Sequence, residues 1–146
     1  MRKDRTNQRL ILCLPMFAAT LFAAYAHASV SAELKGQWVG NSQVEGDKSV
    51  AKTSLTLGAA DADNSILRIE GHNTCTLSQG KYAAGADGAW TLSFGEITGG
   101  DSCSRLAKGT FTLRQGSTAR KLDFEVSYPG PDGGQNLRRG ALSRYP

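Results

Sequence analysis

The stretch Lys121-Leu122-Asp123-Phe124-Glu125-Val126-Ser127 alternates polar and apolar side chains without a break. Successive side chains of an extended chain point to opposite faces, so Leu122, Phe124 and Val126 share one face. The polar residues between them occupy the other face. The stretch therefore predicts a β-strand with one buried and one solvated face.

Similar alternation recurs through the rest of residues 29–146. Trp90, Leu92 and Phe94, for example, are separated by single polar residues. Turn-forming residues separate these runs, and all 17 glycines of the chain lie in this part. We find no apolar stripe there with the 3.6-residue period of a helix. We therefore predict about eight strands, near residues 35–44, 50–57, 66–71, 74–83, 89–97, 108–115, 120–128 and 137–144.

Short turns between strands at this spacing favour a single antiparallel β-barrel, with a two-sheet sandwich as the alternative. The predicted fold class is therefore all-β, one antiparallel β-barrel of about eight strands. A closed barrel of that size has room for side chains or for one small ligand. We favour a mostly filled interior over an open cup. Trp38 and Trp90 are the candidate residues at the barrel end, or in an open cup the candidate ligand contacts.

Residues 1–28 have the order of a secretory signal peptide. A basic start is followed by an apolar run over residues 10–26 and then by Ala26-His27-Ala28, which places small residues on both sides of His27 before a cleavage site. We predict cleavage after Ala28, with Ala32 as the second choice and an uncleaved anchor as the alternative. The prediction leaves one β-barrel domain over residues 29–146, periplasmic or secreted, with no stable membrane anchor after cleavage.

The formal net charge of +4 lies mostly in this leader. Residues 1–28 hold four basic and one acidic side chain, which leaves a net charge of +1 on the remaining 118 residues. A nearly neutral exported domain disfavours nucleic acid as a partner. Arg138, Arg139 and Arg144 add positive charge to the last nine residues. We expect them on a solvated strand, with an acidic partner or lipid head groups as the alternative.

Two cysteines remain after residue 28, Cys75 and Cys103. An even number in an exported chain indicates a disulfide, and closing a loop of about 29 residues contributes roughly 3–4 kcal/mol in the chain-entropy account. A redox pair usually has the Cys-x-x-Cys spacing, and a zinc site needs more ligands than the single histidine His72 supplies. We therefore predict a structural disulfide between Cys75 and Cys103.

Leu34-Lys35-Gly36-Gln37-Trp38 opens the first predicted strand with the pattern Leu-x-Gly-x-Trp. The pattern resembles the opening motif of the lipocalin and avidin superfamilies, small calycin-type barrels. The resemblance implies a closed barrel with Trp38 at one end, and a carrier of a small apolar ligand as a function.

Residues 32–39 also resemble the start of the periplasmic inhibitors of serralysin-type zinc metalloproteases, which are eight-stranded barrels with one disulfide. In that family the residues before the first strand enter the protease cleft. The resemblance therefore implies Ser29, Val30 and Ser31 as candidate partner-binding residues.

A third likeness runs from Cys75 to Cys103. Asn73-Thr74-Cys75, Gly80-Lys81-Tyr82, Asp87-Gly88 and Leu92-Ser93-Phe94 resemble the core of META-domain envelope proteins. This resemblance implies an envelope protein with a structural or stress role and no defined catalytic residues.

The sequence carries no pattern that predicts a reaction centre. His72 has no Gly-x-Ser-x-Gly nucleophile motif to accompany it, and we expect it in a turn. Asp61, Asp63 and Ser65 begin like a calcium loop, but the loop's glycine and final glutamate are absent. The glycines match neither phosphate-binding fingerprint. We therefore expect no catalytic, cofactor-binding or metal-binding residues.

The predicted function is an exported, non-enzymatic binding protein that acts by surface recognition, with inhibition of a secreted or envelope hydrolase as its specific form. The first alternative is a lipocalin- or avidin-like carrier of a small apolar ligand. The second is a META-like envelope protein.

Overall fold

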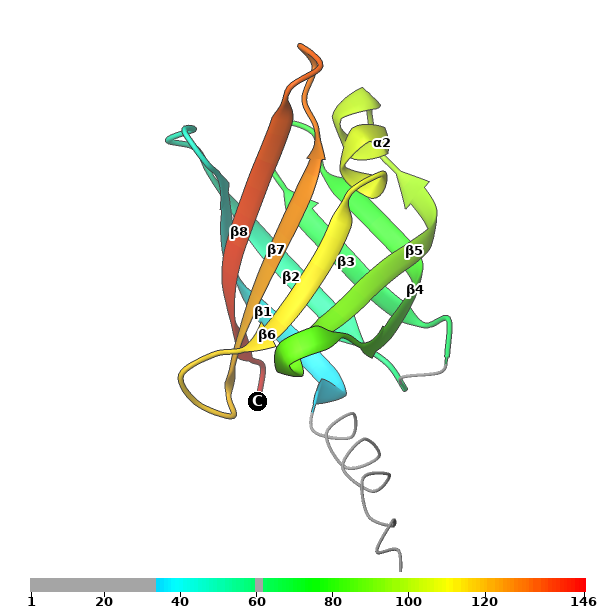
Figure 1. Cartoon of the computed structure of the whole chain (residues 1–146), viewed down its shortest axis with the longest axis vertical. Coiled ribbons are helices and arrows are strands. Elements are labelled where there is room, and N and C mark those ends of the chain that lie inside the picture. The colour runs from blue at the N-terminus through cyan, green and yellow to red at the C-terminus, as the bar shows by residue number, and fades with distance from the viewer. Residues whose placement is uncertain (1–33, 60–61) are drawn as a thin grey trace, which may run out of the picture.

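Eight antiparallel strands close into a barrel, in which each strand pairs with the next and the last pairs with the first (Figure 1). The computed structural model describes residues 34–59 and 62–146. The predicted signal peptide, the candidate residues Ser29, Val30 and Ser31, and Asp61 lie outside the described residues.

The strands are β1 (Gly36–Val44), β2 (Val50–Leu57), β3 (Ser65–Glu70), β4 (Cys75–Ala84), β5 (Trp90–Thr98), β6 (Thr110–Gln115), β7 (Lys121–Pro129) and β8 (Gln135–Arg144). The predicted barrel is confirmed, and each strand begins and ends within two residues of its predicted bounds.

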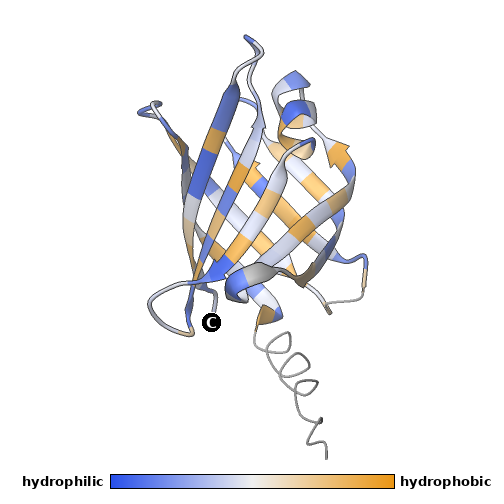
Figure 2. Ribbon diagram, viewed as in Figure 1, coloured by the Kyte–Doolittle hydropathy of each residue, from blue (hydrophilic) through white to orange (hydrophobic). Residues whose placement is uncertain are grey.

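Apolar and polar residues alternate along the strands because one face of the sheet lines the interior (Figure 2). In β7, Leu122, Phe124, Val126 and Tyr128 are buried, and the polar residues between them are exposed. Side chains from all eight strands fill the middle of the barrel, including the fully buried Leu55, Leu67, Leu77, Phe111, Leu113 and Leu142. The interior of this part is therefore a packed core, as predicted.

One end of the barrel, the closed base, is formed by Leu34, Trp38, Tyr82, Trp90 and Arg144. Trp38 Nε1 donates a hydrogen bond to the Leu34 carbonyl oxygen at 2.8 Å. Tyr82 donates its hydroxyl proton to the Gly58 carbonyl oxygen at 3.0 Å. Because the ring nitrogen and the phenol both have partners, these large side chains can be buried at low cost. Figure 1 shows the first described residues and the C-terminus at this same end.

At the opposite end, the mouth, the helix α2 (Asp101–Ala107) lies beside the strands (Figure 1). The sequence reading predicted no helix, and this seven-residue element is too short to show a repeated apolar stripe. It buries only Cys103 and Leu106, and it contacts β4, β5 and β7. The β5–β6 ladder beside it extends over only three residue pairs, from Trp90↔Leu113 to Leu92↔Phe111. The helix therefore packs where the sheet is least paired.

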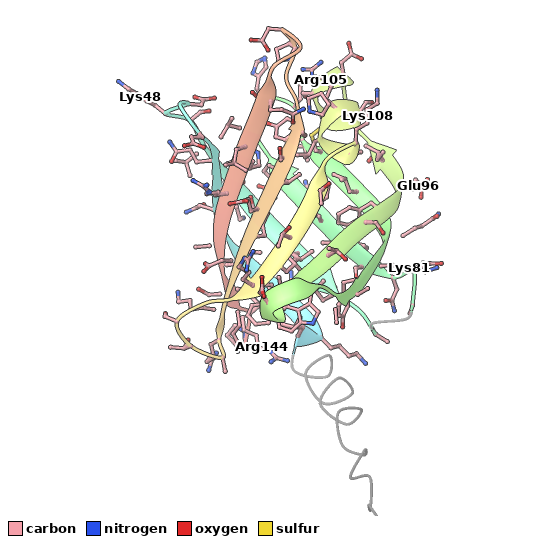
Figure 3. All side chains as sticks on the ribbon, in the orientation of Figure 1. Lys48, Lys81, Glu96, Arg105, Lys108 and Arg144 are labelled. Atoms are coloured by element: carbon pink, nitrogen blue, oxygen red, sulfur yellow. A yellow bond between two sulfur atoms is a disulfide. The ribbon has the colours of Figure 1, made fainter. Side chains whose placement is uncertain are left out.

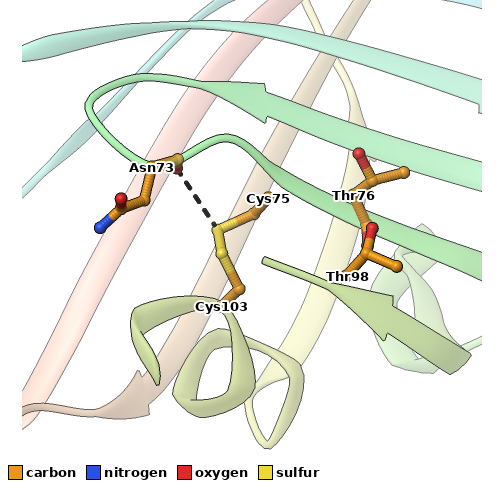
Figure 4. The surroundings of a disulfide bond; sticks show 5 residues. All are labelled: Asn73, Cys75, Thr76, Thr98 and Cys103. Carbon is orange, nitrogen blue, oxygen red and sulfur yellow. Dashed lines mark hydrogen bonds between the residues drawn. A yellow bond between two sulfur atoms is a disulfide. The ribbon is translucent and has the colours of Figure 1, made fainter. Parts of the chain in front are cut away.

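The Cys75–Cys103 disulfide, predicted from the sequence, joins the start of β4 to α2 with a Cα–Cα distance of 5.3 Å (Figure 4). This distance lies in the ordinary range for the bond. The Asn73 carbonyl oxygen lies 3.9 Å from Cys75 Sγ, which is a contact and not a hydrogen bond, because a disulfide sulfur carries no proton. Gly99 precedes the helix with φ of 135°, and a Cβ there would lie 2.4 Å from Cys103 Sγ. Only glycine fits this approach to the disulfide.

Candidate functional site

A cavity of about 390 Å³ opens at the mouth end of the barrel, and we call it the mouth cavity. Its apolar lining comes from β2, β3, β7, α2 and the start of β4 and includes Val50, Ala51, Ile69, Leu106 and Tyr128. Its polar lining comes from β8, which contributes Arg138, from the turns, and from Glu70 at the end of β3 and Ser102 in α2. A volume of this order lies at the low end of the range of small-molecule sites.

Arg138 reaches the mouth cavity because of its place on β8. Its register partners are Val44 on β1 and Val126 on β7, and Val126 is fully buried. Residues two apart on a strand share a face, so Arg138 lies on the same inner face as Leu142. The next residue, Arg139, lies on the outer face. The expectation of three solvated arginines on this strand is therefore wrong for Arg138 and Arg144, whose guanidinium groups contact interior residues.

A chain of hydrogen bonds holds the Arg138 guanidinium. Its Nη1 donates to Ser42 Oγ at 2.9 Å, and Ser42 Oγ lies 2.8 Å from Thr53 Oγ1. Thr53 Oγ1 donates to the Ala51 carbonyl oxygen at 3.2 Å. Because arginine can only donate and a carbonyl can only accept, Ser42 must donate its proton to Thr53. The two buried hydroxyls are thus both committed to holding Arg138.

Within the described residues, the structure gives the Arg138 guanidinium one hydrogen bond and no carboxylate oxygen within 4.0 Å. Arg139 differs, since its Nε donates to Glu125 Oε2 at 2.8 Å and its Nη1 lies 3.9 Å from Glu45 Oε2. The hydrogen bond and the charge of Glu125 raise the pKa of Arg139 above its usual value. Arg139 is therefore in contact with carboxylates of the protein, whereas Arg138, within the described residues, is not.

Two carboxylates near the mouth, Asp47 and Glu70, have partners within the protein. Asp47 Oδ1 accepts the Ser49 backbone N–H at 2.9 Å, and Glu70 Oε1 lies 3.6 Å from Arg68 Nε. The backbone N–H and the hydroxyl of Ser49, with a smaller effect of the Arg138 charge, lower the pKa of Asp47. Figure 3 shows Lys48, Arg105 and Lys108 at this end of the barrel as well.

His72, Ser49 and Ser102 also line the mouth cavity. His72 is exposed in the turn between β3 and β4, as predicted. Among the described residues the structure shows no hydrogen bond between the His72 side chain and either serine or Glu70. No group of three metal-ligating side chains is found in residues 34–59 and 62–146. The mouth cavity therefore presents a guanidinium and several apolar side chains, together with polar side chains that include Glu70 and His72.

A second hollow of about 470 Å³, the outer groove, crosses the outside of β1, β8, β7 and β6. Its lining includes Asp123, Glu125, Arg139 and Ala141. Asp123 and Glu125 are exposed on this face, as predicted, and Glu125 is paired with Arg139. Two of the four charged side chains that line the groove, Glu125 and Arg139, therefore form an ion pair with each other.

Trp38 and Trp90, the predicted barrel-end candidates, are 1 % and 6 % exposed and belong to the core. They lie at the closed base and do not line the mouth cavity. Ser42 and Thr53 were not predicted as site residues, and Arg138 was named only with Arg139 and Arg144 as an alternative contact for an acidic partner or lipid head groups. Counting inward from Leu142 in steps of two would have placed Arg138 on the inner face.

The closed barrel is compatible with a calycin-type fold, the fold of the proteins whose opening motif Leu-x-Gly-x-Trp resembles. No helix in the described part of the chain is long and apolar enough to cross a membrane. The chain matches no protein-family model and no curated protein.

Proposed function

We propose that this protein is a non-enzymatic binding protein that takes a small, partly apolar molecule into the mouth of its barrel. The single observation that carries the proposal is the mouth cavity, about 390 Å³ with apolar walls and one inward arginine. The packed core and the closed base leave the middle of the barrel no room for a ligand. A rigid scaffold of this kind binds without a large ordering cost, because its walls are already in place.

We further propose that the protein works outside the cytosol. The Cys75–Cys103 bond supports this, because structural disulfides persist in oxidising compartments. The signal-peptide pattern of residues 1–28 supports it independently.

The test measures binding of the neutral apolar dye N-phenylnaphthylamine to the full disulfide-bonded domain by fluorescence. Ala51 lines the mouth cavity and packs against the core, so Ala51→Leu fills the cavity and should abolish most of the dye signal. Ala141 lies in the outer groove, so the matched variant Ala141→Leu should leave the signal unchanged. Dye binding that survives Ala51→Leu and is lost in Ala141→Leu would move the site to the outer groove and overturn the proposal.

A second candidate function is inhibition of a secreted hydrolase through the residues before β1. It is favoured by the anchoring of residues 34 and 35 to the closed base, where the Leu34 and Lys35 carbonyls accept hydrogen bonds from Trp38 and Arg144. A segment whose attachment point is already fixed loses less conformational entropy when it enters a cleft. The test compares inhibition of a serralysin-type zinc protease by the domain starting at Ser29 and by one lacking residues 29–31. Equal inhibition by both, or none by either, would exclude this role for Ser29, Val30 and Ser31.

A further inference from the structure

We propose that the mouth cavity selects amphipathic carboxylates, with Arg138 binding the carboxylate and the apolar walls packing the attached hydrocarbon. This inference rests on the proposed function, since it names the class of molecule that the same cavity would take. It assigns a specific role to Arg138 and a positioning role to Ser42 and Thr53.

Most of the hydrogen-bond donors of Arg138 have no partner among the described residues. A guanidinium has five N–H groups, and within the described residues the protein uses one of them, toward Ser42 Oγ. Ser42 Oγ accepts this bond, and the hydroxyl protons of Ser42 and Thr53 pass along the chain to the Ala51 carbonyl. The remaining donors form the planar fork that matches the two oxygens of a carboxylate.

The positive charge of Arg138 also favours binding of an anion. Arg138 is only partly exposed, and a cation withdrawn from water is stabilised by a nearby anion. Asp47 feels the charge of Arg138 but is hydrogen-bonded to Ser49, and Glu70, which lines the cavity, lies beside Arg68. Within the described residues neither carboxylate lies within 4.0 Å of the Arg138 guanidinium. Arg139 shows how the same side chain is satisfied when the protein supplies the carboxylate itself. At Arg138 a carboxylate from outside would complete the equivalent pair.

The apolar part of the cavity wall favours a ligand that contains hydrocarbon. Val50, Ala51, Ile69, Leu106 and Tyr128 line the cavity in which Arg138 lies. Burying hydrocarbon against such walls contributes about 0.8 kcal/mol per methylene group. The small volume favours a short chain over a long lipid. A carboxylate joined to a short hydrocarbon therefore fits both the charge and the shape of the cavity.

The experiment displaces bound N-phenylnaphthylamine from the full domain with four probes: octanoate, octanol, octylamine and acetate. We expect octanoate to displace the dye at a concentration roughly 10- to 100-fold below octanol, because a hydrogen bond to a charged group adds one to two tenfold steps in affinity. Octylamine should be the weakest of the three eight-carbon probes, because its charge opposes that of Arg138. Acetate should fail, because it lacks the hydrocarbon.

The matched variants are Arg138→Gln and Arg139→Gln. Arg138→Gln should remove the advantage of octanoate over octanol, measured as the ratio of the two displacement concentrations within that variant. Arg139→Gln removes an equal charge from the outer face and should change neither this ratio nor the binding of the dye. Arg138→Lys keeps the charge without the fork and should retain part of the octanoate preference.

The outcomes separate this inference from the proposed function. If no dye binds the wild-type domain, or if Ala51→Leu leaves binding intact, the proposed function fails. If the dye binds in the mouth cavity but octanoate and octanol displace it equally, the carboxylate inference alone is wrong. An octanoate preference that survives Arg138→Gln or disappears in Arg139→Gln also overturns it.

Discussion

The guanidinium carbon of Arg144 lies 5.5 Å from the centroid of the Trp38 ring, so the last strand covers the first tryptophan of the barrel. Trp38 and Arg144 are register partners across the β1–β8 ladder that closes the barrel. Arg144 Nη2 also donates to the Lys35 carbonyl oxygen at 2.6 Å. The arginine therefore joins the segment before β1, the buried tryptophan and the final strand.

Arg144→Met should lower the free energy of unfolding by about 1–3 kcal/mol, because it removes a cation–π contact and a charged hydrogen bond while keeping an apolar stem. The measurement is urea unfolding followed by tryptophan fluorescence. Arg120→Met, in the exposed β6–β7 turn, is the control and should change the value by less than about 0.5 kcal/mol. Equal effects of the two variants would show that the contact with Trp38 contributes nothing specific.

Removing the disulfide in the double variant Cys75→Ala, Cys103→Ala should lower the free energy of unfolding by roughly 3–4 kcal/mol, as expected for a sequence separation of 28 residues. The free energies of unfolding of oxidised and reduced wild-type protein should differ by the same amount, while that of the double variant should not respond to reductant.

The intact mass of the exported protein should be two hydrogens below the reduced value. Two free thiols after export would contradict both the bond and its proposed compartment.

Gly140→Ala should destabilise the barrel by about 1–3 kcal/mol, as overpacking of a dense core does. A Cβ at this position would lie 2.1 Å from Phe124 Cε1. Phe124→Leu in the same chain should recover part of the loss by making room for the methyl group. Gly71→Ala is the control, because nothing lies within 4 Å of its added Cβ. A thermal or urea midpoint unchanged by Gly140→Ala would mean that the ring moves aside freely.

The pKa of Asp47, measured by an NMR pH titration, should lie below its usual value of about 3.8. A carboxyl with a lowered pKa stabilises the folded state above its unfolded-state value, and this contribution is lost as the pH falls through the folded-state value. Hydrogen-exchange protection of the Ser49 amide should therefore fall below about pH 3.8. Ser49→Ala should raise the pKa only partly, because the backbone N–H remains. A pKa at or above the usual value would contradict the hydrogen bond.

The strands could be predicted because the sequence states their two faces directly. Along β7 the alternation of Leu122, Phe124 and Val126 with polar residues matches the burial of every position. Turns were visible for a similar reason, since Asp87 and Gly88 adopt φ of 55° and 71°, a conformation that these residue types tolerate. Helix α2 could not be found in this way, because packing and a disulfide hold it rather than its own periodicity.

The candidate site was harder to predict than the fold. Which face Arg138 occupies follows from Leu142, but its role follows from Ser42 and Thr53, which lie on two other strands. Those three side chains meet only because of the exact offset between strands, and sequence alternation alone does not determine that offset. The mouth cavity likewise depends on where α2 packs.

The short β5–β6 ladder makes the contact between these two strands the part of the barrel where neighbouring strands should separate most easily. Elsewhere neighbouring strands are joined over longer ladders, whereas here only three residue pairs connect them, with α2 and its disulfide alongside. Residues 93–98 of β5 pair with β4 on one side only, so those of their amide protons that point away from β4 should exchange with solvent well before those of β7, and faster still after reduction. Since α2 also forms part of the cavity wall, the same fluctuation would set how quickly a ligand enters and leaves.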